Sequence, residues 1–120
     1  MLLTIISKLR RKERIDVFGL NTSYKKKMYN LLVTYTAKDE QTLRAFYQEV
    51  EAAGIISETH KEEGNLRYDY YFSCERANEV LIVEKWVDKA AQVYHDELPH
   101  LIALGKIKEK YGIETAFEEL

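Results

Sequence analysis

Two histidines on either side of a proline are the residues of this sequence best suited to proton transfer. His95 precedes Pro99 and His100 follows it. Histidine changes its charge close to neutral pH, so either ring could act as a general base or proton shuttle. We predict His95 as the base and His100 as a neighbour that contacts the reacting molecule. The alternative for His95 is a helix histidine at a subunit contact or half-exposed, and the alternative for His100 is a structural hydrogen bond. His60 stands outside any such grouping and is expected at the surface.

Asn65 and Arg67 are candidates for holding a negative charge on the reacting molecule. An asparagine amide can donate a hydrogen bond to a developing oxyanion, and a guanidinium can bind an anionic group. Asn65 follows Gly64, so it could equally be a turn residue. Arg67 could instead form a salt bridge with an acid such as Asp69 or Glu84. The sequence does not decide between the two roles of Asn65 or between the two roles of Arg67.

Aromatic residues are frequent enough to line a small-molecule pocket, since nine of the 120 residues are tyrosine. The candidates for such a lining are Tyr35, Tyr68, Tyr70 and Trp86. Their rings would supply apolar walls and the tyrosine hydroxyls would orient a ligand. The alternative for each of these four side chains is that it simply packs in the hydrophobic core.

We expect neither a metal nor a cofactor. His95, His100 and Glu84 are the only combination that suggests a metal site, and Pro99 breaks the helical spacing of the two histidines. A single cysteine, Cys74, excludes a multi-thiolate site and a disulfide within one chain. It also favours a reducing, cytoplasmic setting.

The composition is that of one soluble globular domain, with 46% hydrophobic and 32% charged residues. No apolar run approaches the roughly 20 residues of a membrane span. The net charge of −2 hides an asymmetry, because residues 1–27 carry +6 and the other 93 residues carry −8. An acidic body has no electrostatic reason to bind nucleic acid.

The basic segment 1–27 is expected to be separate from the domain that follows at 28–120. Its apolar residues before the basic cluster could form an amphipathic helix for a membrane surface or a partner. The favoured alternative is a poorly ordered extension, with Met28 as an alternative start.

The pattern of apolar residues predicts the order β-α-β-β-α-β, the ferredoxin-like split βαβ of an α+β domain. Strands are expected at 30–36, 66–73, 79–87 and 114–120, with helices between them. Periodicity does not decide whether 55–63 is helical or extended. In the second strand, Leu66 is expected to share one face with Tyr68, Tyr70 and Phe72.

Short-range signals set the ends of the predicted helices. Asp39 and Asp88 suit the N-cap position, and Gly54 and Gly112 suit helix ends. Pro99 should interrupt the second helix and start a new one, because its ring clashes with the preceding turn.

The strand at 79–87 is apolar on nearly both faces and so needs cover on both sides. Two helices can cover only one side of the sheet. We therefore expect the other side to meet a second subunit in a homodimer.

Three runs resemble the antibiotic biosynthesis monooxygenase (ABM) domain family: E-G-N-L-R-Y-D at 63–69, E-x-W-x-D at 84–88, and A-x3-H-x3-P-H at 91–100. The resemblance covers residues 28–120. It implies a dimeric α+β barrel in which two subunits join their sheets, with a pocket between the sheet and the helices of each subunit.

The activities implied by this resemblance differ between branches of the family. The haem-degrading branch fits poorly, because its catalytic tryptophan would fall at His95 and its iron-ligating histidine near Gly105. An isomerase of phosphorylated autoinducer-2 and the quinol oxygenases both share motifs with this chain. Neither branch is separated from the other by the sequence.

We predict a cofactor-independent monooxygenase acting with O₂ on a small aromatic, quinol or anthrone-like substrate. His95 would be the base, with Asn65 and Arg67 holding the anion. The alternatives are an isomerase of a small phosphorylated ketone and a non-catalytic dimeric binding module. Aromatic pocket walls would favour the oxygenase and several cationic groups the isomerase. An occluded pocket with His95 facing solvent would favour the binding module.

Overall fold

The computed structural model describes residues 27–120. The segment 1–27, predicted as an amphipathic helix or a poorly ordered extension, therefore lies outside the described residues except for residue 27. The elements are β1 (Tyr29–Thr36), α1 (Glu40–Ala52), α2 (Ile55–His60), β2 (Asn65–Phe72), β3 (Glu79–Trp86), α3 (Lys89–Asp96), α4 (Pro99–Tyr111) and β4 (Glu114–Glu119).

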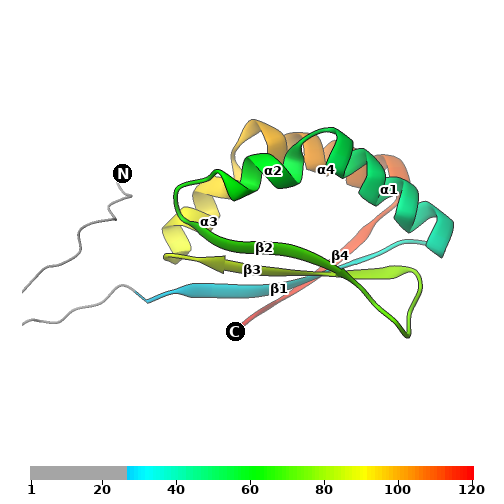
Figure 1. Cartoon of the computed structure of the whole chain (residues 1–120), viewed down its shortest axis with the longest axis horizontal. Helices are drawn as coiled ribbons and strands as arrows, with labels where there is room; N and C mark the ends of the chain where they lie inside the picture. The colour runs from blue at the N-terminus through cyan, green and yellow to red at the C-terminus, as the bar shows by residue number, and fades with distance from the viewer. Residues whose placement is uncertain (1–26) are drawn as a thin grey trace, which may run out of the picture.

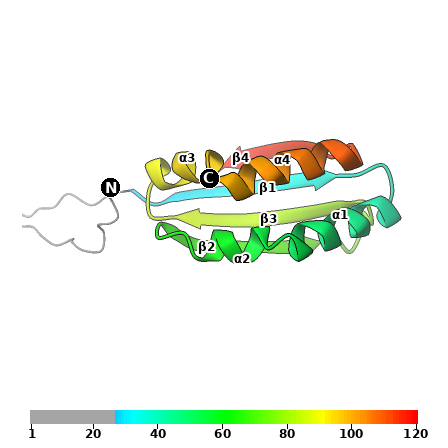
Figure 2. The same cartoon turned by 90° about the horizontal axis from the view of Figure 1, so that it is seen from above.

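The four strands form one antiparallel sheet in the order β2-β3-β1-β4. The four helices of the described residues all lie over one face of this sheet (Figure 1). Seen from the helix side, α1 and α2 run above β2 and β3, while α3 and α4 run above β1 and β4 (Figure 2). This arrangement confirms the α+β, ferredoxin-like fold class.

The core lies between the sheet and the helices. Alternate residues of β1 and β3 point into it, which is the pattern expected when one face of an antiparallel sheet is covered. The largest apolar side chains buried there are Trp86, Tyr68, Phe46, Leu43, Ile55, Ile82 and Leu104. The candidate base and aromatic residues belong to this same layer.

The helix ends follow the predicted capping signals. The side chain of Asp39 accepts a hydrogen bond from the amide of Thr42 at 2.8 Å, and Asp88 accepts one from Ala91 at 2.9 Å. Gly54 and Gly112 have φ angles of 77° and 64°, the left-handed conformation that follows many helices. The segment that periodicity left open contains the short helix α2.

Pro99 splits the long helical region as expected. α3 ends at Asp96, Leu98 is extended with φ −78° and ψ 154°, and Pro99 opens α4. As a consequence, His95 and His100 belong to two different helices that meet at this break.

The start of β2 differs from the predicted alternation. Asn65 pairs with Trp86 and Arg67 pairs with Lys85, so the register shifts at Leu66. Leu66 is 52% exposed and does not join Tyr68 on the buried face, contrary to expectation. A bulge of this kind adds a residue to one strand and redirects its side chain.

The sheet face away from the helices has no cover within the described chain (Figure 1). A second subunit on that face stays a prediction. Among the described residues, no helix has the length and apolar character needed to cross a membrane.

Candidate active site

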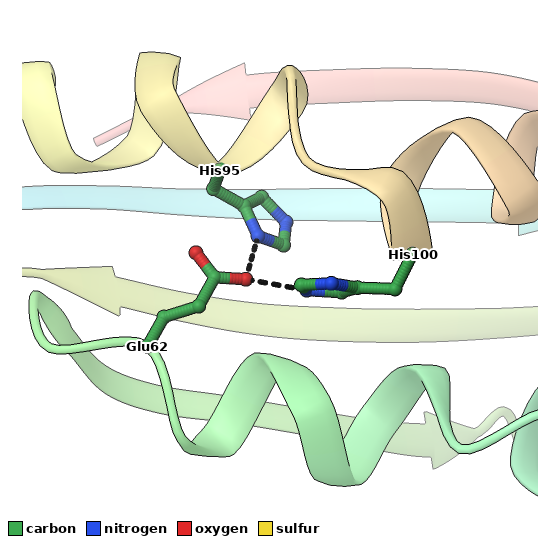
Figure 3. A group of neighbouring side chains, drawn as sticks. All are labelled: Glu62, His95 and His100. Atoms are coloured by element: carbon green, nitrogen blue, oxygen red, sulfur yellow. Dashed lines mark hydrogen bonds and ion pairs between the residues drawn. The ribbon is translucent and has the colours of Figure 1, made fainter.

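A partly buried glutamate lies between the two histidines (Figure 3). The Oε2 atom of Glu62 is 2.6 Å from Nδ1 of His95 and 2.7 Å from Nε2 of His100. The side chain of His95 is 2% exposed, that of Glu62 9%, and that of His100 16%. The three side chains therefore form one cluster with His95 at its deep end and His100 nearer the surface.

Three separate elements hold this cluster. His95 lies in the last turn of α3 and His100 in the first turn of α4, while Glu62 follows α2. The backbone of Glu62 is fixed on both sides, since its amide donates to Thr59 and its carbonyl accepts from Asn65, each at 3.0 Å. The carboxylate is therefore held in place by its own turn.

Gly64 lets this turn approach α3 closely. A β-carbon at Gly64 would lie 2.5 Å from the β-carbon of Ala91 and 3.2 Å from the side chain of Val87. The carbonyl of Gly64 also accepts a hydrogen bond from the amide of Val87 at 2.9 Å. Space, rather than backbone freedom, is what this position requires.

The hydrogen bonds define where the ring protons are. An ionised carboxylate can only accept, so Nδ1 of His95 and Nε2 of His100 both carry a proton toward Glu62. In a neutral imidazole the other nitrogen then bears the lone pair. The second nitrogen of the His95 ring points away from Glu62 (Figure 3). His95 is thus set up as a base whose tautomer is fixed by a carboxylate.

Aromatic rings enclose His95. Its ring centroid lies 4.6 Å from that of Trp86 and 5.7 Å from that of Tyr68, and both neighbours are buried. The indole N–H of Trp86 donates to Oε1 of Glu84 at 2.9 Å. Burial raises the pKa of the Glu84 carboxyl, and the hydrogen bond from Trp86 offsets part of that rise.

Tyr35 and Tyr70 continue the aromatic layer away from the histidines. The hydroxyls of Tyr68 and Tyr70 are 3.4 Å apart, and the rings of Tyr35 and Tyr70 meet edge to face at 6.3 Å. Burial raises the pKa of all three tyrosines above the ordinary value, because the charged phenolate is poorly solvated there. Their hydroxyls are therefore protonated donors at neutral pH.

An open hollow of about 440 Å³ leads to the cluster. It lies between the end of α2 and the break before α4 and is lined by Glu58, Lys61, Glu62, Leu98, Pro99 and His100. Of the three clustered side chains, Glu62 and His100 line this hollow and His95 does not. A second hollow of about 280 Å³, lined by residues that include Tyr71 and Arg76, contains none of the three clustered side chains.

The sequence of residues 28–105 matches the family model described as antibiotic biosynthesis monooxygenase. The match covers more than half of the chain. The protein belongs to the ABM family.

Relatives of this ABM protein agree with that assignment. It is 36% identical over 59 residues to YcnE of Bacillus subtilis, a candidate monooxygenase. The matched segment spans 47% of this chain and 62% of YcnE, so the chain covers less than two thirds of that relative's length.

Solved structures of similar shape show the same fold. A Bacteroides thetaiotaomicron protein of unknown function, described as a possible oxidoreductase, superposes with a TM-score of 0.68 at 22% identity, over 78% of this chain and 95% of its own. A candidate antibiotic biosynthesis monooxygenase of Nitrosomonas europaea gives 0.66 at 18% identity, over 82% and 91%.

The structure brings together some of the predicted site residues of this ABM domain but not all. His95, His100, Trp86 and Tyr68 are neighbours, and Tyr70 and Tyr35 follow in the same layer. The exposed His60, as expected, is outside the cluster and bonds the carbonyl of Tyr68 at 2.8 Å.

Arg67 and Asn65 are not joined to the histidines. Arg67 lies on the sheet face away from the helices, where its Nε donates to Asp69 at 2.9 Å and its guanidinium also bonds Tyr71. The salt bridge to Asp69 is the structural alternative considered from the sequence. The amide of Asn65 donates to the carbonyl of Arg67 at 3.1 Å.

Glu62 is the site residue that the sequence did not reveal. It lies just before the E-G-N-L-R-Y-D run, and its partners are 33 and 38 positions further along the chain. No short-range pattern reports a contact across that separation. Glu84, the acid considered beside the histidines, instead bonds Trp86.

Proposed function

We propose that this ABM protein is a cofactor-independent monooxygenase that acts on a small aromatic, quinol or anthrone-like substrate. Family membership supports a monooxygenase-like function. The observation that carries the finer proposal is the buried pairing of Glu62 with two histidines, one of which is packed among aromatic rings. Such a substrate can become an electron-rich anion that reduces O₂ itself, so the protein must mainly supply a base and a dry site.

In the proposed reaction, the unprotonated ring nitrogen of His95 takes a proton from the substrate. Glu62 keeps the ring in the required tautomer and stabilises the imidazolium that forms, as a carboxylate does beside a catalytic histidine in general. The substrate anion then passes electrons to O₂. One oxygen atom enters the substrate and the other leaves as water.

The neighbouring residues would bind and orient the substrate. His100 borders the hollow and would contact the substrate first. Trp86 and Tyr68 would exclude water around His95, with Tyr35 and Tyr70 behind them. The side-chain amide of Asn65 donates to the carbonyl of Arg67 in its own strand, and it would turn from there to an oxyanion. Arg67 faces the other side of the sheet, and we assign it no role within its own subunit.

The features named for the two alternatives are weaker in the described residues. A phosphorylated substrate calls for several cationic groups, whereas the hollow includes one lysine, Lys61, which already pairs with Glu58 at 3.1 Å. A non-catalytic binding module would be marked by an occluded pocket with His95 facing solvent, and the side chain of His95 is buried. The lining of the hollow includes no Tyr, Trp or Phe, so the predicted aromatic pocket walls are not what supports the oxygenase. Its support comes from the rings of Trp86 and Tyr68 packed against His95.

Oxygen uptake by metal-free protein with a panel of reduced quinols and anthrones tests this proposal. We expect uptake above substrate autoxidation, and we expect Glu62→Gln and His95→Ala to lower kcat by about 100-fold or more, the range of general-base catalysis. Glu62→Gln keeps the shape of the side chain and removes only its charge. His60→Gln is the matched control and should keep its activity.

Two results would contradict the proposal. One is uptake that never exceeds autoxidation with any member of the panel. The other is uptake that survives unchanged in folded Glu62→Gln and His95→Ala proteins. Circular dichroism of each variant establishes that it is folded before its rate is compared.

A further inference from the structure

We propose that Glu62, His95 and His100 also form a binding site for one divalent transition-metal ion of the Zn²⁺ class. We further propose that the bound ion blocks the use of His95 as a base. The metal site itself rests on the geometry alone, whereas its inhibitory effect rests on the proposed function.

The three possible ligand atoms converge on one point. Nδ1 of His95, Nε2 of His100 and a carboxylate oxygen of Glu62 all lie within 4.8 Å of one another. Zinc binds histidine nitrogen and carboxylate oxygen at about 2.0–2.2 Å, which places ligand atoms of a tetrahedral site roughly 3.4 Å apart. Both nitrogens now lie 2.6–2.7 Å from Oε2 of Glu62. A retreat of less than about 1 Å by each would make room for the ion.

The donor set has the right chemistry. Two histidines and one glutamate are the protein ligands of one class of zinc site that keeps a further position open. Two histidines and a carboxylate also suit ferrous iron. A metal ion would take the place of the two ring protons that now point at Glu62, and each neutral ring would then carry its proton on the other nitrogen. Binding should weaken at a pH low enough to protonate the rings, because an imidazolium has no lone pair for a metal.

A second observation points to a ligand at Glu62. Its other carboxylate oxygen, Oε1, is buried and has no hydrogen-bond partner among the described residues. The whole side chain is only 9% exposed. A buried polar atom without a partner is rare and costly, and it calls for an explanation. A cation beside the carboxylate would interact with this oxygen as well as with Oε2.

The surrounding structure provides both a rigid frame and a way in. The ligands come from a hydrogen-bonded turn and from two helix ends, so little ordering is needed on binding. The hollow lined by Glu62 and His100 connects the cluster to the surface. Pro99 breaks the helical spacing of the histidines, which argued against a metal site from the sequence. The same break is what lets both rings reach one carboxylate.

Metal binding and proton transfer would use opposite nitrogens of the same ring. With an ion on Nδ1, the neutral ring of His95 would carry its proton on the other nitrogen, which is the one that the proposed reaction uses as the base. An ion bound at Nδ1 of His95 removes the hydrogen bond that orients the ring and places a positive charge beside the base. A ring held in this way is a poorer acceptor for a substrate proton. We therefore expect Zn²⁺ to inhibit the oxygenase reaction and a chelator to restore it.

Isothermal titration of the untagged full chain with Zn²⁺ tests the site directly and needs no substrate. The experiment uses a Cys74→Ser background, because Cys74 is an exposed thiol that could bind zinc by itself. We expect one ion per chain and a higher Tm in its presence. Co²⁺ should show visible absorption bands typical of low-coordinate histidine and carboxylate ligation.

Glu62→Gln and His100→Ala should each weaken Zn²⁺ binding by more than about tenfold, the lower end of the losses seen when even an outer partner of a metal ligand is removed. His60→Gln is the control, because it changes the one other histidine of the chain. Its affinity should match that of the parent protein. Because His100 and Glu62 line an open hollow, both test variants should fold, and Tm without metal checks this.

Absence of Zn²⁺ binding to the parent protein would overturn the inference. Equal binding by the parent and by folded Glu62→Gln and His100→Ala proteins would also overturn it, since the ion would then sit elsewhere. The two proposals fail separately. Zinc binding without oxygen uptake would leave the metal site standing and remove the oxygenase, and uptake without zinc binding would do the reverse.

Discussion

A single carboxylate, Glu62, determines what both histidines can do. Its Oε2 atom contacts one nitrogen of each histidine ring and so favours a proton on that nitrogen. His95 is buried and His100 is partly buried. A second acid, Glu84, lies in the same layer but serves Trp86 instead. The two glutamates therefore have different tasks, and the second one offers a test of the electrostatics around the aromatic layer.

Glu84→Gln should change the pH dependence of stability. Burial raises the pKa of Glu84 in the folded state. The stability linked to its protonated form is thus fully present below the unfolded pKa and is lost as the pH rises through the folded pKa. Glutamine still accepts from Trp86 but cannot ionise. We expect a higher Tm than the parent at pH 8 and little difference at pH 4, measured by thermal denaturation.

The prediction is contradicted if the Tm of Glu84→Gln at pH 8 lies below that of the parent at pH 8. That result would mean that the charge of Glu84 stabilises the fold. Glu58→Gln provides the matched control, because Glu58 is an exposed residue whose contact to Lys61 is a surface pair. Its Tm should follow that of the parent at both pH values.

For the helices and strands, the sequence correctly predicted the features that depend on neighbouring residues. Caps, helix-ending glycines and the break at Pro99 depend on a few neighbouring residues, and each lies where the pattern indicated. The bulge at Leu66 was missed because strand register depends on a partner strand. Glu62 was missed for the same reason, since its partners arrive only after the chain has folded.

Gly64→Ala tests how closely the turn that carries Glu62 packs against α3. The added methyl group would lie 2.5 Å from the side chain of Ala91, so we expect a loss of about 1–3 kcal/mol in the free energy of unfolding. Urea denaturation measures this. Gly105→Ala is the control, because a β-carbon there meets nothing within 4 Å and alanine favours a helix.

Adding Ala91→Gly to Gly64→Ala should recover part of the lost stability, because the colliding methyl group is removed. If the double variant were no more stable than Gly64→Ala, the loss would not come from this contact. An unchanged stability in Gly64→Ala would show that the turn can move away from α3 freely.

For the whole molecule, the uncovered face of the sheet remains the main open surface. The central strand β3 presents Leu81, Val83 and Lys85 there, between β1 and β2. Leu81 and Val83 alternate with the buried Val80 and Ile82, so the middle of the strand is apolar toward both sides. We propose that a second copy of the chain covers this face in a homodimer.

Light scattering at micromolar concentration should give the mass of a dimer. Val83→Lys should shift the mass toward a monomer, because it places a charge at the centre of the proposed contact. Ile102→Lys is the control, since Ile102 is an exposed apolar residue on α4, on the other side of the molecule. A monomeric parent protein, or a Val83→Lys protein that stays dimeric, would contradict the proposed homodimer.

The last strand has a consequence for how the chain is made. Among the strands of residues 27–120, β4 lies at an edge of the sheet and pairs only with β1, and it is exposed along its whole length. Ribosomes deliver a chain from its N-terminus, and domains fold as their segments become available. Every residue of the cluster is synthesised before β4, and so are the helices that cover the core. The last strand therefore joins a sheet whose other three strands, and the cluster beside them, all precede it along the chain.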